Sequence, residues 1–89
     1  MPLVIYVDID KTICTGPPES DPLNYLRALP YETRIEAIND LYDAGHAIVY
    51  WTARGTKSGI NWYDETYKQL KEWGCKFHQL QMGKPVYDM

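Results

Sequence analysis

The sequence predicts an α/β fold with a parallel β-sheet. Two short apolar segments, at 3–7 and 46–52, are rich in the residues typical of buried strands, and a third predicted strand at 76–82 has Phe77, Leu80 and Met82 as its apolar positions. They alternate with two segments, 31–44 and 60–73, whose apolar residues recur at spacings of three and four, as in amphipathic helices. The order β-α-β-α-β requires crossover connections, which are right-handed and join parallel strands.

The first strand ends in two carboxylates, Asp8 and Asp10, which Lys11 and Thr12 follow directly. Ligands of open α/β sheets bind at the carboxyl ends of the strands. Two acids placed side by side are costly unless a cation or a proton lies between them. This stretch is therefore the first candidate functional site, although Asp is also common where a strand simply passes into a loop.

The segment 11–30 is rich in proline and glycine, which predicts a loop or a small flap over the end of the first strand. A loop of this length in a small domain is usually functional or disordered. Its position directly after Asp10 favours a flap, with a floppy insert as the alternative.

Both predicted helices have recognisable ends. Pro30 and Glu32 favour the start of the first helix, and Gly45 favours its end. Gly74 closes the second helix in the same way. We assign the apolar stripes of both helices to the core and attach no functional role to them.

Polar side chains also follow the second and third strands. Thr52 and Arg54 come after the second strand, and Lys84 comes after the third. Each can bind an anion, but each alone is a weak signal, because Thr belongs in strands and Arg and Lys are usually solvated. Since the carboxyl ends of parallel strands share one rim, we expect Asp8, Asp10, Thr52 and Lys84 to lie together, which is a stronger signal.

The composition is that of a globular chain. With 89 residues, 45% of them hydrophobic, we expect one domain spanning 1–89, near the lower size limit for a self-sufficient core. The net charge is −3, whereas proteins that bind nucleic acid carry a basic surface. No apolar run is long enough to cross a bilayer. Cys14 and Cys75 lack CxxC spacing, so we expect a cytoplasmic protein with free thiols.

The strand-end residues resemble the motifs of the haloacid dehalogenase-like (HAD) superfamily of phosphotransferases. The sequence DIDKT at 8–12 resembles its DxDxT motif, Thr52 its second motif, and Lys84 in GKP its third. The stretch WGCKFHQLQMGKPVYD is similar to a small cap-poor subgroup often linked to sugar-phosphate or capsule biosynthesis. The resemblance covers the whole chain. It implies a three-layer Rossmann-like sheet of strand order 3-2-1, with helices on its faces and a small flap at 11–30.

The resemblance also implies a mechanism. Asp8 would be the nucleophile that forms an aspartyl-phosphate, and Asp10 would protonate the leaving oxygen and then activate water. Mg²⁺ would be held by Asp8 and Asp10, the latter through its backbone carbonyl. Thr52 would hydrogen-bond a phosphoryl oxygen, and Lys84 would neutralise charge on the nucleophile and the intermediate.

Two further residues, Thr12 and Arg54, are expected to bind the substrate, with Arg54 and the flap contacting the leaving group. The substrate would be a small phosphorylated metabolite, such as a sugar phosphate. This makes a magnesium-dependent phosphatase the leading interpretation. The alternative is a non-catalytic phosphate-binding or assembly module with the same fold. A third interpretation, a receiver-like domain, fits less well because receivers place their acids on different strands.

The chain departs from the family pattern at its C-terminus. The family continues with a fourth strand that carries a metal-binding acidic pair, whereas this sequence ends at Met89, as a fragment or as a natural truncation. Asp88 matches the acid before that strand, so it receives no metal role. We therefore expect weak magnesium binding and slow turnover or none. The uncovered edge of the first strand is expected to pair in a homodimer or to lie under the flap.

Overall fold

The computed structural model describes residues 2–22, 24–56 and 59–84. Within them, three parallel strands form one sheet in the order β1-β2-β3, which confirms the expected strand order. The strands are β1 (Val4–Val7), β2 (Ala47–Trp51) and β3 (Gln79–Gln81). Each lies inside the segment that the apolar pattern predicted.

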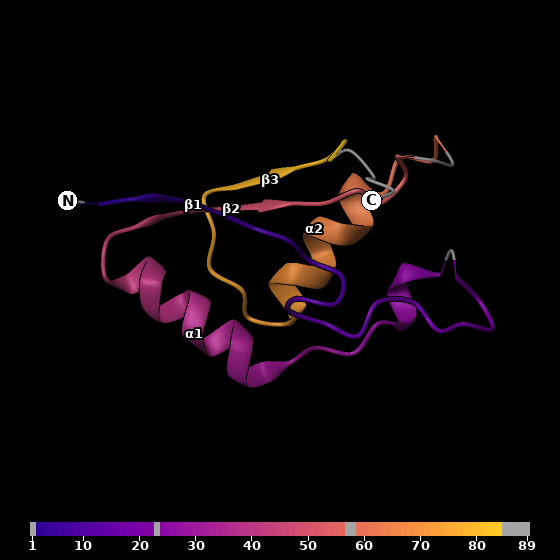
Figure 1. Cartoon of the computed structure of the whole chain (residues 1–89), viewed down its shortest axis with the longest axis horizontal. Helices are drawn as coiled ribbons and strands as arrows, with labels where there is room; N and C mark the ends of the chain where they lie inside the picture. The colour runs from indigo at the N-terminus through magenta and orange to yellow at the C-terminus, as the bar shows by residue number, and fades with distance from the viewer. Residues whose placement is uncertain (1, 23, 57–58, 85–89) are drawn as a thin grey trace, which may run out of the picture.

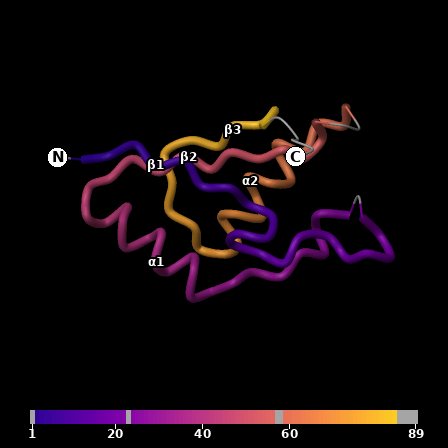
Figure 2. The backbone as a smooth tube through the Cα atoms, viewed as in Figure 1, coloured from indigo at the N-terminus to yellow at the C-terminus, as the bar shows by residue number. Residues whose placement is uncertain are grey.

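Two α-helices connect the strands, α1 (Glu32–Asp43) and α2 (Tyr63–Glu72), and a short 3-10 helix, η1, covers Tyr25–Arg27. Both α-helices lie on the same side of the sheet (Figures 1 and 2). Two right-handed crossovers that step in the same direction across a sheet carry their helices to one face. The described residues thus form two layers, and the third layer that we expected is not among them. None of the helices described is both long and apolar enough to span a membrane.

The ends of both helices follow the glycine signals in the sequence. Gly45 and Gly74 adopt left-handed backbone conformations, with φ of +98° and +75°. The residue after each glycine donates its N–H back into the last helical turn, from His46 to the Leu41 carbonyl and from Cys75 to the Leu70 carbonyl. These are Schellman caps, which satisfy carbonyls that the helix itself leaves unpaired.

The core lies between the sheet and the helices. Its sheet side is formed by alternate strand residues, including Val7, Ile48 and Tyr50, which are at most 6% exposed. The segment 11–30 also contributes to it, because Ile13 and Cys14 are fully buried. That segment is therefore tied to the body of the domain by burial, in contrast to a floppy insert.

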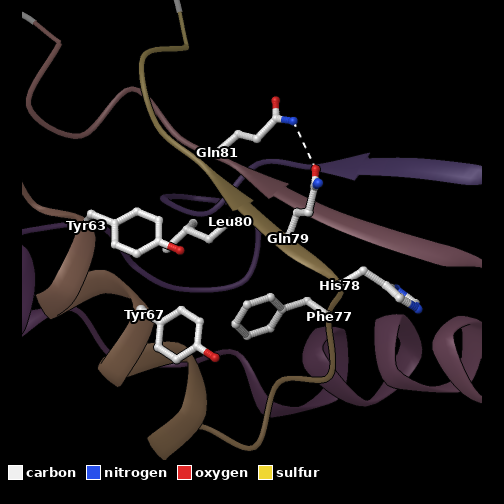
Figure 3. A pocket seen from close by; sticks show the side chains of 7 residues that line it. All are labelled: Tyr63, Tyr67, Phe77, His78, Gln79, Leu80 and Gln81. Carbon is white, nitrogen blue, oxygen red and sulfur yellow. Dashed lines mark hydrogen bonds between the residues drawn. The ribbon is translucent and has the colours of Figure 1, made fainter.

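The opposite face of the sheet is more open. Val4 and Tyr6 on β1 are 63% and 57% exposed. On β3, the side chains of Gln79 and Gln81 lie on the side away from α2, hydrogen-bonded to each other (Figure 3). The period of two along each strand separates these residues from the core-facing ones.

Both cysteines are free, as expected from the sequence, and both are buried. Burial is the main cause that raises the pKa of the Cys14 thiol to about 11, and the pKa of Cys75 likewise to about 11. A raised thiol pKa means that the folded state holds the proton more tightly than the unfolded chain does. The stabilisation is fully present below the unfolded thiol pKa and is lost as the pH rises through the folded value.

We expect native Cys14 and Cys75 to react slowly with iodoacetamide. At about pH 8, a two-unit rise in pKa lowers the thiolate fraction about 100-fold, and burial slows the reaction further. Mass spectrometry would follow alkylation in buffer and in urea. Ser20→Cys, which adds a thiol at an exposed position, is the matched control and should react fast in both. Rapid native labelling of Cys14 would contradict its burial.

Candidate functional site

The carboxyl ends of the three strands meet on one rim. The Thr52 N–H donates to the Gln81 carbonyl, and the Lys84 N–H donates to the Thr52 carbonyl, both at 3.0 Å. The Lys84 amine lies 3.4 Å from a carboxylate oxygen of Asp8. Asp8, Thr52 and Lys84 are therefore together, as the topology predicted.

These three side chains differ in accessibility. The side chains of Asp8 and Lys84 are 40% and 29% exposed, so both the carboxylate and the amine can reach a ligand from solvent. Thr52 is only 1% exposed. Its hydroxyl oxygen accepts the Arg54 N–H at 3.1 Å, which leaves its own O–H free to donate to another group.

A tight turn follows β1 and contains Asp10. The N–H groups of Thr12 and Ile13 both donate to the Ile9 carbonyl, and Lys11 has a φ of +65°. The left-handed conformation is uncommon for a residue with a side chain and is found where the surrounding structure requires it. Thr12, a predicted substrate contact, is half-buried in this turn, and its carbonyl accepts a hydrogen bond from Arg34.

Asp10 has a partner that the sequence did not reveal. The Arg54 guanidinium binds its carboxylate with two hydrogen bonds, Nη2 to Oδ1 at 2.8 Å and Nε to Oδ2 at 3.0 Å. The Arg54 side chain is 0% exposed and the Asp10 side chain 23% exposed. Bidentate arginine–carboxylate pairs of this kind are strong and fix the orientation of both groups.

All five N–H donors of Arg54 are used inside the protein. Beyond Asp10, Nη2 lies 3.9 Å from the Cys14 sulfur, and Nη1 donates to Thr66 at 3.3 Å and to Gln69 at 2.7 Å. The guanidinium also lies over the Tyr25 ring at 4.9 Å. This burial argues against the leaving-group contact that we expected of Arg54, because no donor remains for a substrate.

A signal for this network was present in the sequence of α2. Thr66 and Gln69 are polar residues on the buried side of the helix, at 0% and 6% exposure. Buried polar side chains need hydrogen-bonding partners, so their presence on an apolar stripe indicates a polar group facing it. The sequence alone does not say that this group is Arg54, which lies 12 and 15 residues away.

The metal-ligand set on the rim is small. In the part of the chain that the structure describes, no group of three or more His, Cys, Asp or Glu side chains could hold a metal ion. The Asp10 carboxylate is bound by Arg54, so Asp10 has its backbone carbonyl left to offer a metal. Asp8 offers an accessible carboxylate. One carboxylate, one carbonyl and water are compatible with magnesium, which often keeps several waters.

A groove lies on the β3 side of the sheet, away from the rim. It has a volume of about 390 Å³ and lies between α2 and β3, with Tyr63 and Tyr67 facing Phe77 and Leu80 (Figure 3). Its lining includes no Asp, Glu, Lys or Arg and none of the rim residues. The rim is therefore the better candidate for chemistry, since it holds the charged groups.

The fold and the rim define an α/β protein with a three-stranded parallel sheet and a charged site at its carboxyl edge. No family model matches the chain, and no curated protein matches it. A crystal structure described as an MCSG target from Vibrio cholerae matches it with a TM-score of 0.82 and 22% sequence identity. The match covers 97% of this chain and 72% of the other. At this identity the likeness shows the fold alone.

Proposed function

We propose that this chain is a magnesium-dependent phosphomonoester hydrolase of the HAD-like type, acting on a small phosphorylated metabolite in the cytoplasm. The observation that carries the proposal is the rim itself. Asp8 and Lys84, 76 residues apart in the sequence, lie 3.4 Å apart, and Thr52 is joined to Lys84 through the backbone. A carboxylate in contact with an amine, with a threonine at the end of the neighbouring strand, matches what phosphoryl transfer through a carboxylate requires.

The proposed chemistry has two displacements at phosphorus. An Asp8 oxygen forms a bond to phosphorus as the bond to the leaving oxygen breaks, and that oxygen takes a proton from Asp10. Water then attacks the phosphorus and gives a proton to Asp10, and the bond to Asp8 breaks, releasing phosphate. Lys84 lowers the cost of charge at Asp8, and the free O–H of Thr52 donates to a phosphoryl oxygen.

Magnesium is part of the proposal. Asp8 through its carboxylate and Asp10 through its backbone carbonyl would hold the ion, which would supply charge neutralisation at the phosphoryl oxygens. Because the described residues offer only one accessible carboxylate at this place, that of Asp8, which Lys84 also contacts, we expect weak magnesium affinity and slow turnover. We also propose that the segment 11–30 acts as a flap beside the rim, since its Cys14 and Tyr25 border the Arg54–Asp10 pair.

The test is release of p-nitrophenol from p-nitrophenyl phosphate by the purified chain. Turnover should depend on millimolar magnesium, stop with a chelator and return when magnesium is restored. A chain without magnesium-dependent turnover would favour the alternative, a non-catalytic phosphate-binding module. The small metal-ligand set is the observation that favours this alternative. Binding of inorganic phosphate, seen by calorimetry and lost in Lys84→Met, would then support it.

We further propose a homodimer through the outer edge of β1. Within the described residues β1 pairs on one side only, with β2. The residues of this edge carry no charge, and Leu3, Val4 and Tyr6 are each more than half exposed. An uncharged, unpaired edge strand readily pairs with an identical one.

Sedimentation velocity over a range of protein concentrations should therefore show a reversible dimer. We expect Val4→Lys to shift the protein to the monomer, because a charge on an apolar edge strand opposes pairing. Leu26→Lys, which places the same charge at a 56% exposed residue of η1, should leave the dimer unchanged. A wild-type chain that stays monomeric at every concentration would contradict the proposal.

A further inference from the structure

The Arg54 guanidinium joins the region that follows β1 to α2, and both are distant from Arg54 in sequence. From the turn after β2 it contacts Asp10 beyond the end of β1, Cys14 and Tyr25 in the segment 11–30, and Gln69 on α2. Gln69 in turn donates to the Tyr25 carbonyl at 3.0 Å. A buried charge with this many partners is costly to leave incomplete, so the arrangement admits little variation.

We propose that Arg54 is the positioning residue of Asp10. It holds the carboxylate in one orientation and leaves Oδ2 as the oxygen at which Asp10 exchanges a proton with the substrate. This inference rests on the phosphatase function proposed above. It assigns Arg54 a role that acts through Asp10, without contact with the substrate.

The choice of oxygen follows from the hydrogen bonds of the carboxylate. Each oxygen of a carboxylate has two lone pairs. Oδ1 accepts a hydrogen bond from Arg54 Nη2 at 2.8 Å. The Cys14 thiol lies 3.5 Å from Oδ1 and 3.6 Å from the Ile9 carbonyl oxygen, and it can donate its proton to either acceptor. Oδ2 accepts Arg54 Nε alone among the described contacts, at 3.0 Å. Oδ2 is thus the oxygen with a lone pair left for a proton.

Lysine could not replace the arginine in this role. The fork of Arg54 binds both carboxylate oxygens in one plane while its remaining amine binds α2. A lysine amine is a single point charge with three donors, so it would let the carboxylate rotate. Rotation of the Asp10 carboxylate would move the free lone pair of Oδ2 away from the leaving oxygen. The rate of proton transfer would then fall, while substrate binding would not weaken.

The first measurement detects the ion pair without any assay of activity. In ¹H–¹⁵N spectra of arginine side chains, the Arg54 Nε–H should be visible and slow to exchange with water. Arg54→Lys assigns the signal by removing it. In Asp10→Asn the protection should be lost, because an amide cannot accept at both of its terminal atoms. An Arg54 Nε–H that exchanges as fast as that of the exposed Arg27 would overturn the inference.

The second measurement separates positioning from substrate binding. With p-nitrophenyl phosphate and magnesium, Arg54→Lys should lower kcat on the order of 10²-fold and leave KM within about twofold, because the lost interaction acts on proton transfer. Lys68→Arg, the reverse exchange at an exposed position on α2, is the control and should change neither constant. A raised KM with unchanged kcat would overturn the inference, because Arg54 would then be a substrate contact.

A milder variant covers the case in which Arg54→Lys does not fold. Gln69→Met removes one acceptor of Nη1 at similar volume and keeps the fork on Asp10. We expect about a tenfold loss in kcat with KM unchanged and partial loss of Nε–H protection. Unchanged kcat and protection would overturn the inference. Protected Nε–H in a wild-type chain without turnover would contradict the phosphatase function while leaving the ion pair established.

Discussion

Asp8→Asn is expected to abolish magnesium-dependent phosphate release, by about 10³-fold or more. An amide oxygen is a poor nucleophile and carries no charge to hold a metal, so the variant loses the bond-forming group and the metal ligand together. Removing a covalent nucleophile is among the costliest single changes that an active site can undergo. The measurement is the initial rate with p-nitrophenyl phosphate and millimolar magnesium.

The variant should stay folded, which makes the result interpretable. The side chains of Asp8 and Lys84 are both partly exposed, and ion pairs of this kind contribute little to stability. Circular dichroism and thermal melting would confirm this. Asp64→Asn makes the same chemical change at an exposed position on α2 and should keep full activity. An active Asp8→Asn would show that the hydrolysis occurs elsewhere or by another mechanism.

Gly55→Ala is expected to lower the free energy of unfolding strongly, and by more than Gly59→Ala in the same loop. Gly55 has a φ of +79°, and a Cβ placed on it would lie 2.0 Å from the backbone carbonyl oxygen of Ile60. Backbone cannot move aside as a flexible side chain can, so the turn must open. We expect a cost of about 3 kcal/mol, from the left-handed conformation and the clash together.

Gly59→Ala is the matched control, because Gly59 lies in the same loop with a φ of +73° and nothing within 4 Å of the added Cβ. Only the conformational cost applies there, about 1 kcal/mol. Urea unfolding, followed by tryptophan fluorescence, compares the two. Since Gly55 adjoins Arg54, Gly55→Ala should also weaken the protection of the Arg54 Nε–H. Equal destabilisation by the two variants would contradict the close approach to Ile60.

Much of the fold could be predicted from local patterns. The strands and helices lie inside their predicted segments, and Gly45 and Gly74 end the helices because each can adopt a left-handed conformation without cost. The ends of the elements shifted by a few residues, since local periodicity does not show where hydrogen bonding stops. Among the strands the third shrank most, from 76–82 to Gln79–Gln81. The layering differed because two crossovers in the same direction place both helices on one face (Figure 1).

The candidate site could likewise be predicted only in part from the sequence. The convergence of Asp8, Thr52 and Lys84 followed from topology, because parallel strands bring their carboxyl ends to one rim whatever the side chains do. The partner of Asp10 did not follow. Arg54 was expected to bind the substrate, whereas the structure buries it among acceptors on α2 and the Cys14 sulfur of the segment 11–30.

The sequence by itself determined the α/β class, the parallel direction of the strands and the edge of the sheet that carries the charged residues, because periodicity and crossover handedness are local or nearly universal rules. The order of the strands was implied by the family resemblance. Only the tertiary structure decided that Arg54 is buried against Asp10, and that a Cβ at Gly55 would meet the Ile60 backbone. Both depend on atoms from separate segments meeting at a distance of a few ångströms, which no local pattern specifies.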